Sequence, residues 1–221
     1  MSSILIIDTS GDSASVIMTE NERMLQSITN DIQNEHAAFL HKAIIQLTEK
    51  TKPLNEVDAI AVSAGPGSYT GLRIGMASAK GLCYALDRPL ITIGTLPAMA
   101  RAMISAGGYE ADTLFCPMID ARRMEAYVAV YDSNMAEVVA PASKILDKES
   151  FSDIMKAHRV IFFGSGAEKW KALIQNEHAT FLKNVNINTS LCLITHEKYK
   201  SKDFTDLIYS EPAYLKEFFT G

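Results

Sequence analysis

Short apolar runs alternate with polar turns along the first half of the chain, a spacing typical of an α/β protein. The first run ends at Asp8, where a polar turn leads into a stretch of alternating apolar and polar positions. Apolar residues at intervals of three and four positions, by contrast, predict helices. The strands expected in this half are residues 4–7, 14–18, 24–29, 59–62 and 90–93. The expected helices are residues 35–49, with Asn34 as the N-cap, a helix that ends at Leu86, and residues 96–105.

The second half of the chain repeats the order of elements of the first half. An apolar run at 115–119 ends at Asp120, and a polar turn separates it from a strand expected at 127–131. A strand at 159–163 then leads into a glycine-containing loop and a helix, as happens at the corresponding place in the first half. The repeated order predicts two similar α/β domains, and a single mixed domain with chance similarity is the alternative. The predicted domains are residues 1–105 and the smaller 106–221, whose last helix is expected to pack on the first domain.

Neither a membrane protein nor a secreted protein is expected from the composition. No apolar run approaches the roughly 20 residues of a membrane span. The first residues, Met-Ser-Ser-Ile-Leu, have no basic region or cleavage site of a leader. The three cysteines are far apart and form no C-x-x-C motif, which suits a reducing compartment. We therefore expect a cytoplasmic protein in which Cys83, Cys116 and Cys192 are small core residues.

The acidic balance of the chain weighs against nucleic-acid binding by this chain alone. The net charge is −5 at pH 7, and the sequence shows no basic stripe of the kind that holds phosphate backbones. The nearest candidate is the group Lys198, Lys200 and Lys202, which more simply forms a solvated face. Any contact with RNA is therefore expected to come mainly through a partner.

A glycine-rich stretch at residues 63–82, SAGPGSYTGLRIGMASAKGL, joins an expected strand to an expected helix. It lacks the lysine and the spacing of a phosphate-binding P-loop. Thr70 stands where the last glycine of a G-x-G-x-x-G motif would be. Backbone amides at the start of the helix could bind an anion without these motifs, but phosphate binding is the weaker interpretation.

Small residues continue along one face of the helix that follows. Gly71, Gly75, Ser78 and Leu82 share this face, and a neighbouring face is apolar. A glycine inside a helix costs about 1 kcal/mol relative to alanine, so its small size should serve a close approach by another backbone. The two faces together predict contact with the domain's own sheet on one side and with a helix of another chain on the other.

Two aspartates at equivalent places are the candidates for chemistry. Asp8 and Asp120 each end the first strand of a half and precede a turn. In two-domain ATPases such aspartates face a cleft and position a metal or a water, whereas elsewhere they bond to the backbone of their own turn. The pattern leaves both interpretations open. No metal site is expected, because His36 and His41 are five positions apart and project about 140° from each other around a helix.

Five stretches of the sequence together resemble the bacterial TsaB (YeaZ) family over nearly the whole chain. They are ILIIDTS, AVSAGPGSYTGLRIGMASAKGL, TIGTLPAMA, IDARRMEAYVAVY and EPAYLK. The resemblance implies an actin-like, sugar-kinase and Hsp70-like ATPase fold with two domains of duplicated topology, in agreement with the repeat. It also implies a role in making threonylcarbamoyladenosine next to the anticodon of tRNAs that read codons starting with A.

The resemblance further implies a non-catalytic subunit. Its partners would be TsaD, the catalytic paralogue that transfers the threonylcarbamoyl group, and TsaE, a small P-loop ATPase, with a homodimer when TsaD is absent. TsaD carries an H-x-x-x-H pair for its metal, whereas residues 94–103 of this chain contain no histidine and no carboxylate. We therefore expect no metal and no cofactor on this chain alone, and any ATP or ADP belongs to the complex.

The family places partner contacts on the helices of the first domain. The residues expected on that face are Leu40, Ala43, Ile44, Leu47, Gly71, Gly75, Ser78 and Leu82. A degenerate nucleotide cleft is expected at Asp8, Gly65, Gly67 and Asp120. One alternative is a stand-alone ATPase or small-molecule kinase of the same fold that uses both aspartates. Another is a metallopeptidase, which the lack of a metal or nucleophile constellation disfavours.

Overall fold

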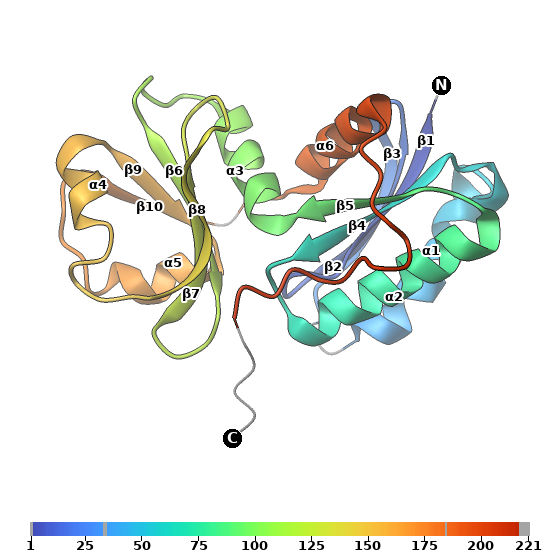
Figure 1. Ribbon diagram of the computed structural model, residues 1–221, viewed down its shortest axis with the longest axis horizontal. Helices are drawn as coiled ribbons and strands as arrows, with labels where there is room; N and C mark the ends of the chain where they lie inside the picture. Colours follow the sequence, from blue (N-terminus) through green and yellow to red (C-terminus); the bar gives the residue numbers. More distant parts are fainter. Residues whose placement is uncertain (1, 33–34, 184, 217–221) are drawn as a thin grey trace. The chain divides into compact units, whose positions relative to one another are not determined.

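The computed structural model describes residues 2–32, 35–183 and 185–216 of the chain. The described residues form two five-stranded sheets with helices packed against them (Figure 1), which confirms the predicted α/β class. Asn34, the predicted cap of the first helix, lies outside the described residues.

The first sheet is built from the first half of the chain. Its strands are β1 (Ser3–Asp8), β2 (Ala14–Glu20), β3 (Arg23–Asn30), β4 (Ala59–Gly65) and β5 (Leu90–Gly94), in the order β3-β2-β1-β4-β5. β1 pairs antiparallel with β2 and parallel with β4, so the sheet is mixed. All residues of the central strand β1 are buried, as is typical of a continuous apolar run covered on both faces.

Two helices connect the strands of this half, and a third follows the last strand. They are α1 (His36–Lys50), α2 (Tyr69–Leu86) and α3 (Thr95–Ala106), with a short 3₁₀ turn η1 (Leu54–Glu56) before β4. Ser68 caps α2, because its hydroxyl accepts a hydrogen bond from the Gly71 amide. Pro89 lies between α2 and β5, and proline cannot continue a helix.

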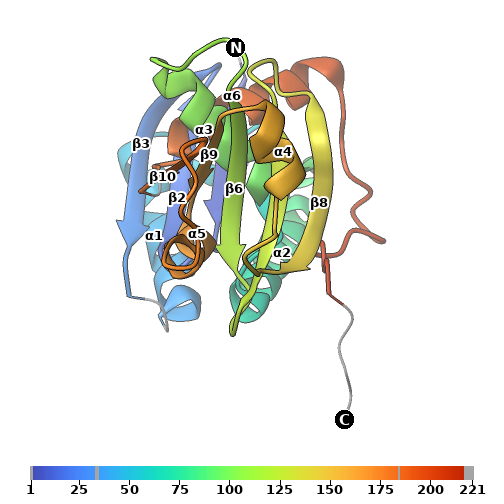
Figure 2. The same cartoon turned by 90° about the vertical axis from the view of Figure 1, so that its left-hand side faces the viewer.

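The second sheet repeats the first one strand for strand. Its strands are β6 (Leu114–Asp120), β7 (Glu125–Tyr131), β8 (Glu137–Ile145), β9 (Val160–Phe163) and β10 (Ala179–Leu182), in the order β10-β9-β6-β7-β8 (Figure 2). β6 pairs antiparallel with β7 and parallel with β9, as β1 does with β2 and β4. The helices of this half are α4 (Ser152–Ala157), α5 (Ser165–Lys171) and α6 (Asn188–Ser201). The duplicated topology expected from the sequence is therefore present.

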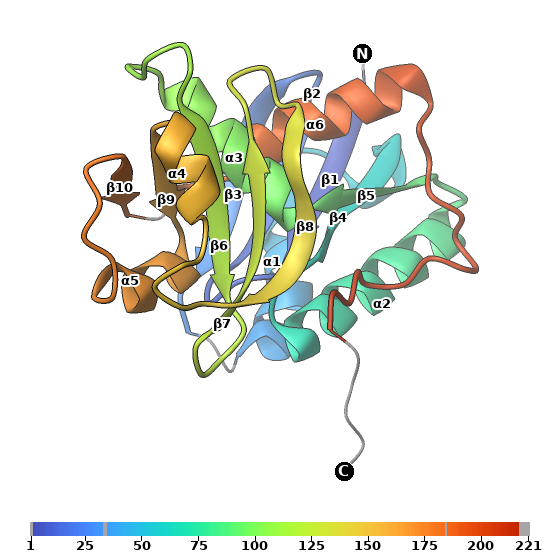
Figure 3. The ribbon, with the colours of Figure 1, turned by 60° about the vertical axis from the view of Figure 1, so that its left-hand side comes forward.

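The chain divides into two compact units whose borders differ from the predicted domain borders. One unit comprises Met1–Thr95 with Asn188–Ala213, and the other comprises Leu96–Ile187 with Tyr214–Gly221. The helix that ends each half thus belongs to the unit built on the other half. α3 contributes Met99 and Met103 to the core of the second unit, and α6 contacts β1, β2 and β5 of the first (Figure 3). The predicted border after residue 105 assigns α3 to the first domain. The sequence does not show which sheet a helix covers, so it could not reveal that α3 belongs to the second unit.

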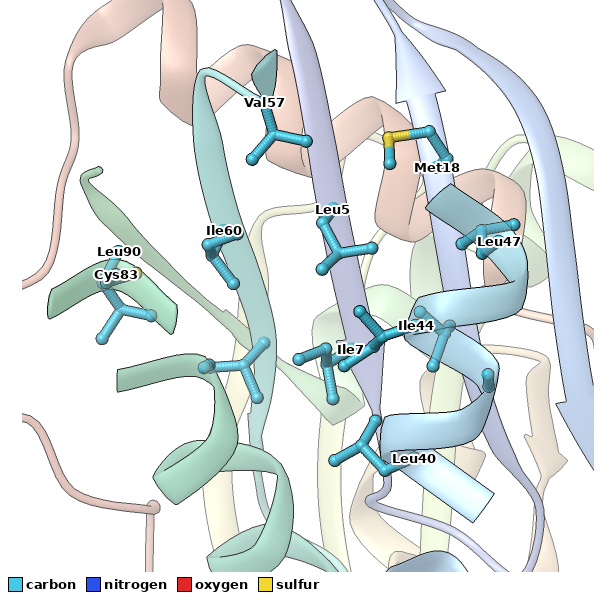
Figure 4. Packing of buried hydrophobic residues seen from close by; sticks show 14 of the residues in the cluster. Leu5, Ile7, Met18, Leu40, Ile44, Leu47, Val57, Ile60, Cys83 and Leu90 are labelled. Atoms are coloured by element: carbon cyan, nitrogen blue, oxygen red, sulfur yellow. The ribbon is translucent and has the colours of Figure 1, made fainter. Parts of the chain in front are cut away.

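The core of the first unit lies between its sheet and the pair α1 and α2. Figure 4 shows Leu40, Ile44 and Leu47 of α1 directed toward Leu5 and Ile7 of β1. Their spacing along α1 is the apolar stripe of a helix that covers a sheet. This stripe accounts for the position of the helix without any other partner.

The core of the second unit contains a cluster of aromatic side chains. Phe162 packs edge-on against Trp170, with ring centroids 4.9 Å apart, and Phe151 and Phe181 complete the group. The buried indole Nε1 of Trp170 donates a hydrogen bond of 2.8 Å to the Asp147 carbonyl. Because this polar atom is satisfied, the tryptophan is buried without an unpaired donor.

Candidate functional site

Asp8 closes a tight turn at the carboxyl end of β1. Its Oδ1 accepts hydrogen bonds from the Ser10 amide at 3.0 Å and from the Ser10 hydroxyl at 2.6 Å. The side chain is buried. These are the contacts of a turn residue that bonds to the backbone of its own turn, one of the two interpretations that the sequence leaves open.

The glycine-rich loop packs directly on this turn. The Ser68 amide donates to the Ser10 carbonyl at 2.7 Å, and a Cβ on Gly67 would stand 2.2 Å from that same oxygen. Gly65 has a φ of +109°, and a Cβ there would stand 3.1 Å from the Ala213 carbonyl. The small residues at 65 and 67 therefore let the loop lie against the protein's own backbone. The structure brings Asp8, Gly65 and Gly67 together at one end of the first sheet.

Gly71 and Gly75 bring α2 against the residue that follows β1. A Cβ on Gly71 would stand 2.0 Å from the Thr9 carbonyl, and one on Gly75 would stand 2.3 Å from Thr9 Oγ1. Both glycines are buried. The expectation that they face a partner is corrected, because the backbone they approach belongs to their own unit.

The same correction applies to the predicted residues of α1. Leu40, Ala43, Ile44 and Leu47 are between 0% and 4% exposed and form the core under the sheet. Their side chains are covered by their own unit and are not available on a surface. Ser78 and Leu82 of α2 are half-buried, so within the predicted face these two reach the surface in part.

The outward faces of α1 and α2 carry residues that the sequence reasoning missed. Ile45 is 58% exposed and Tyr84 is 84% exposed. Gly81 also faces outward, and a Cβ there would meet no atom of the described part of the chain within 4 Å. The sequence pattern could have identified Ile45 and Tyr84 as exposed, because they are large apolar residues outside the stripe that covers the sheet. We call Ile45, Ala77, Gly81, Tyr84 and Ala85 the outer face of α1 and α2.

Asp120 lies in the second unit, where it anchors the turn between β6 and β7. Its Oδ1 accepts a hydrogen bond of 2.8 Å from the Arg122 amide and forms an ion pair with Lys169. The Asp120 amide donates to the Ser165 hydroxyl at 3.0 Å. Like Asp8, this aspartate holds its own turn.

The cysteines are placed as the sequence predicts, in the cores of the units. Burial raises the pKa of the Cys83 thiol to about 12 and that of Cys192 to about 11, and it raises the pKa of Cys116 further. Such thiols are protonated at neutral pH and are poor nucleophiles. Within the described parts of the chain, no group of three or more His, Cys, Asp or Glu side chains could hold a metal ion. No helix in those parts is long and apolar enough to cross a membrane.

A family model described as TsaD, tRNA N6-adenosine threonylcarbamoyltransferase, matches residues 25–216. The chain belongs to this family. The resemblance to its TsaB (YeaZ) members, expected from the sequence, is confirmed by relatives that carry this name. TsaB of Bacillus subtilis is 28% identical over 177 residues, which cover 78% of this chain and 75% of that protein.

Two further relatives extend the comparison. TsaB of Haemophilus influenzae is 35% identical over 125 residues, 56% of this chain and 51% of that protein. The chain thus spans about half the length of this relative in the match. A crystal structure of a Pseudomonas aeruginosa protein described as similar to the peptidase YeaZ superposes with a TM-score of 0.84 and 26% identity. The superposition covers 98% of this chain and 100% of that one, so the two share the fold throughout.

Proposed function

We propose that the chain is a non-catalytic scaffold and activator of threonylcarbamoyl transfer to N6 of the adenosine next to the anticodon, in tRNAs that read codons starting with A. In this proposal it forms a heterodimer with the catalytic paralogue TsaD, works with the ATPase TsaE, and forms a homodimer when alone. The transferase family model and the names of the relatives support this pathway. The tRNA is held mainly through the complex.

Helix α3 carries the argument for a non-catalytic role. It corresponds to the region where, by the resemblance, the catalytic paralogue holds its metal through two histidines. Its sequence here is TLPAMARAMISA, which has no histidine and no carboxylate. Met99 and Met103 are instead buried against Phe115 and Phe163. A helix of apolar side chains in a core has no ligands to offer a metal, so transfer chemistry must come from the paralogue.

The outer face of α1 and α2 supports a contact with the paralogue. The contacts of Thr9 explain the small size of Gly71 and Gly75. Gly81, by contrast, has no neighbour among the described residues that requires its small size. A glycine inside a helix costs about 1 kcal/mol relative to alanine, and a second helix at close range would use the space. Tyr84, on the next turn, is the exposed aromatic side chain that such a helix would cover.

The test is assembly of the complex with variants of this face. In Gly81→Leu the new side chain occupies the space left for the partner, whereas Ala157→Leu makes a similar change at an exposed position of α4. Gel filtration with light scattering should show that Gly81→Leu stays apart from the paralogue and that Ala157→Leu joins it. Equal assembly by both variants would remove the outer face from the proposal.

A stand-alone ATPase or small-molecule kinase is the weaker proposal. Its two aspartates are already engaged, Asp8 by Ser10 and Asp120 by Lys169 and Arg122. It predicts ATP turnover by the purified chain that is lost in Asp8→Ala. We expect no turnover above background from the wild-type chain.

A further inference from the structure

The turn between β6 and β7 holds two consecutive arginines in an unusual backbone conformation. Arg122 has a φ of +69° and Arg123 has a φ of +50°. Residues other than glycine rarely adopt positive φ, and asparagine, aspartate and histidine are the usual exceptions. Two neighbouring arginines in this region are strained, and strain of this kind persists where the surroundings impose it.

Lys169 contacts the backbone of this turn at several points. Its ammonium group donates to the carbonyls of Arg123 at 2.8 Å and Glu125 at 2.5 Å, and it forms an ion pair with Asp120. Asp120 in turn accepts the Arg122 amide. A lysine from α5 thus uses all three of its donors on the turn and fixes the backbone that carries both arginines.

The acidic groups of the turn are neutralised by lysines and not by the arginines. Asp120 pairs with Lys169, and Glu125 pairs with Lys216 and accepts a hydrogen bond from Ser143. These contacts lower the pKa of the Glu125 carboxyl, and the hydrogen bond with Lys216 has the largest effect. Arg122 and Arg123 are exposed, and no acidic group of the described residues pairs with either guanidinium.

We infer that Arg122 and Arg123 bind the phosphodiester backbone of an RNA. Two exposed guanidinium groups on a rigid turn form a compact positive site in a chain whose net charge is −5. Guanidinium matches phosphate through paired hydrogen bonds and is weakly hydrated, so it suits this ligand better than an ammonium group does. Proteins usually bind a small nucleotide in a concave pocket, whereas an exposed turn can bind the phosphate backbone of a polymer. The exposed position of the two arginines therefore favours an RNA over a small nucleotide.

This inference rests on the proposed function, because it takes the RNA to be the tRNA of the same complex. It adds a direct contact from this chain to a partner that is otherwise held by the paralogue. A phosphate contact positions the RNA and carries no sequence information, so the site would act on any tRNA of the right shape.

The test measures how tRNA binding to the complex with the paralogue depends on salt. The probe is an unmodified transcript of a tRNA that reads a codon starting with A. The variant is Arg122→Gln with Arg123→Gln, and the control is Arg159→Gln with Lys171→Gln, which removes the same charge from the same unit. Arg159 is a suitable control residue because its guanidinium already pairs with Glu110 at 3.1 Å.

The arginine variant should bind the transcript more weakly than the control. The slope of log affinity against log salt should become shallower by roughly one for each arginine replaced, about two in all, because each guanidinium neutralises one phosphate. Equal affinity and slope in the variant and the wild type, or an equal loss of affinity in the variant and the control, would overturn the inference. Loss of ATP binding with tRNA binding intact would assign the arginines to a nucleotide, and loss of assembly would assign them to an acidic protein surface; either result overturns it.

A second variant guards against loss of structure. Arg122→Asn with Arg123→Gly places residues that tolerate positive φ in the turn, so it should melt at or above the temperature of the wild type and still lose tRNA affinity. Failure of the proposed function has a different signature: threonylcarbamoyl transfer would proceed without the wild-type chain, whatever the arginines do. Transfer that needs the chain, with tRNA affinity unchanged in both variants, would leave the function standing and remove the arginine site.

Discussion

Thr9 and Gly71 are in direct contact across the end of the first sheet. The Thr9 hydroxyl donates a hydrogen bond of 2.7 Å to the Gly71 carbonyl, and a Cβ on Gly71 would stand 2.0 Å from the Thr9 carbonyl. The turn after β1 therefore passes beneath the first turn of α2 with no room for a side chain. This contact explains why the loop between β4 and α2 is rich in small residues.

Substitution of the buried and exposed glycines of α2 should have opposite effects on stability. Gly71→Ala drives a methyl group into the Thr9 carbonyl, so it should lower the free energy of unfolding by about 1–3 kcal/mol. The methyl group of Gly81→Ala contacts none of the residues that the structure describes and restores helix propensity, so this change should raise that free energy by about 0.5–1 kcal/mol. Urea titration of the two variants measures both changes. A stabilised Gly71→Ala would show that the Thr9 contact does not constrain the helix.

His196 of α6 is buried as a neutral side chain and should make stability depend on pH. Its Nε2 lies 2.8 Å from Thr19 Oγ1, and its Nδ1 lies 3.2 Å from Ser2 Oγ. Thr19 Oγ1 also lies 3.3 Å from the Ile4 carbonyl oxygen. Burial lowers the pKa of His196 below its usual value, although the negative charge of Glu22 acts in the opposite direction and raises this pKa.

The sign of this pH dependence follows from where the proton binds. Below the usual histidine pKa of about 6.5 the unfolded chain takes up a proton that the folded chain excludes, so the free energy of unfolding should fall as the pH drops. His196→Gln should reduce that slope. Urea titrations between pH 5 and about 7.5 measure it. An unchanged slope in His196→Gln would place the titrating group elsewhere.

Removal of the Lys169 ammonium should loosen the turn between β6 and β7. Lys169→Met leaves the Arg123 and Glu125 carbonyls without their donor and Asp120 without its ion pair. The side chain of Lys169 is 20% exposed, so we expect a loss of about 1–2 kcal/mol in the free energy of unfolding. Amide hydrogen exchange of residues 121–125 should accelerate at the same time. Unchanged exchange would show that the turn keeps its conformation without Lys169.

The three cysteines should be unreactive in the folded protein. Their thiols are buried and their pKa values are raised, those of Cys192 and Cys83 to about 11 and about 12. A thiol reagent at neutral pH should therefore label the chain only at the rate of unfolding, and fully in denaturant. Fast labelling of the native protein would contradict the described cores.

Much of the fold was predictable because the spacing of apolar residues along the chain identifies its strands and helices. The apolar run before Asp8 and the one before Asp120 each end the first strand of a half, and the observed sheets have the predicted duplicate order. The exchange of α3 and α6 between the units was only partly expected, since the choice of sheet depends on contacts between residues far apart in sequence. Asp120 illustrates the same limit: its partner Lys169 comes from a distant helix.

The candidate partner face was less predictable, because both faces of α2 contain small or apolar residues. The stripe of Leu40, Ile44 and Leu47 is the pattern of a helix on its own sheet, and the structure places it there. The burial of Gly71 depends on the path of the turn at Thr9, which no local pattern records. The residues left for a partner are those that break the amphipathic pattern, such as Tyr84.

A count of modified adenosines in a reconstituted reaction tests whether the chain is required for threonylcarbamoyl transfer. The catalytic paralogue, the ATPase subunit, tRNA and threonylcarbamoyl-adenylate are mixed with the wild-type chain, with Gly81→Leu, with Ala157→Leu, or with no chain. A scaffold predicts full modification with the wild type and Ala157→Leu, and only background modification with Gly81→Leu or without the chain. Equal modification in the reaction that lacks the chain would show that the chain is not a required subunit.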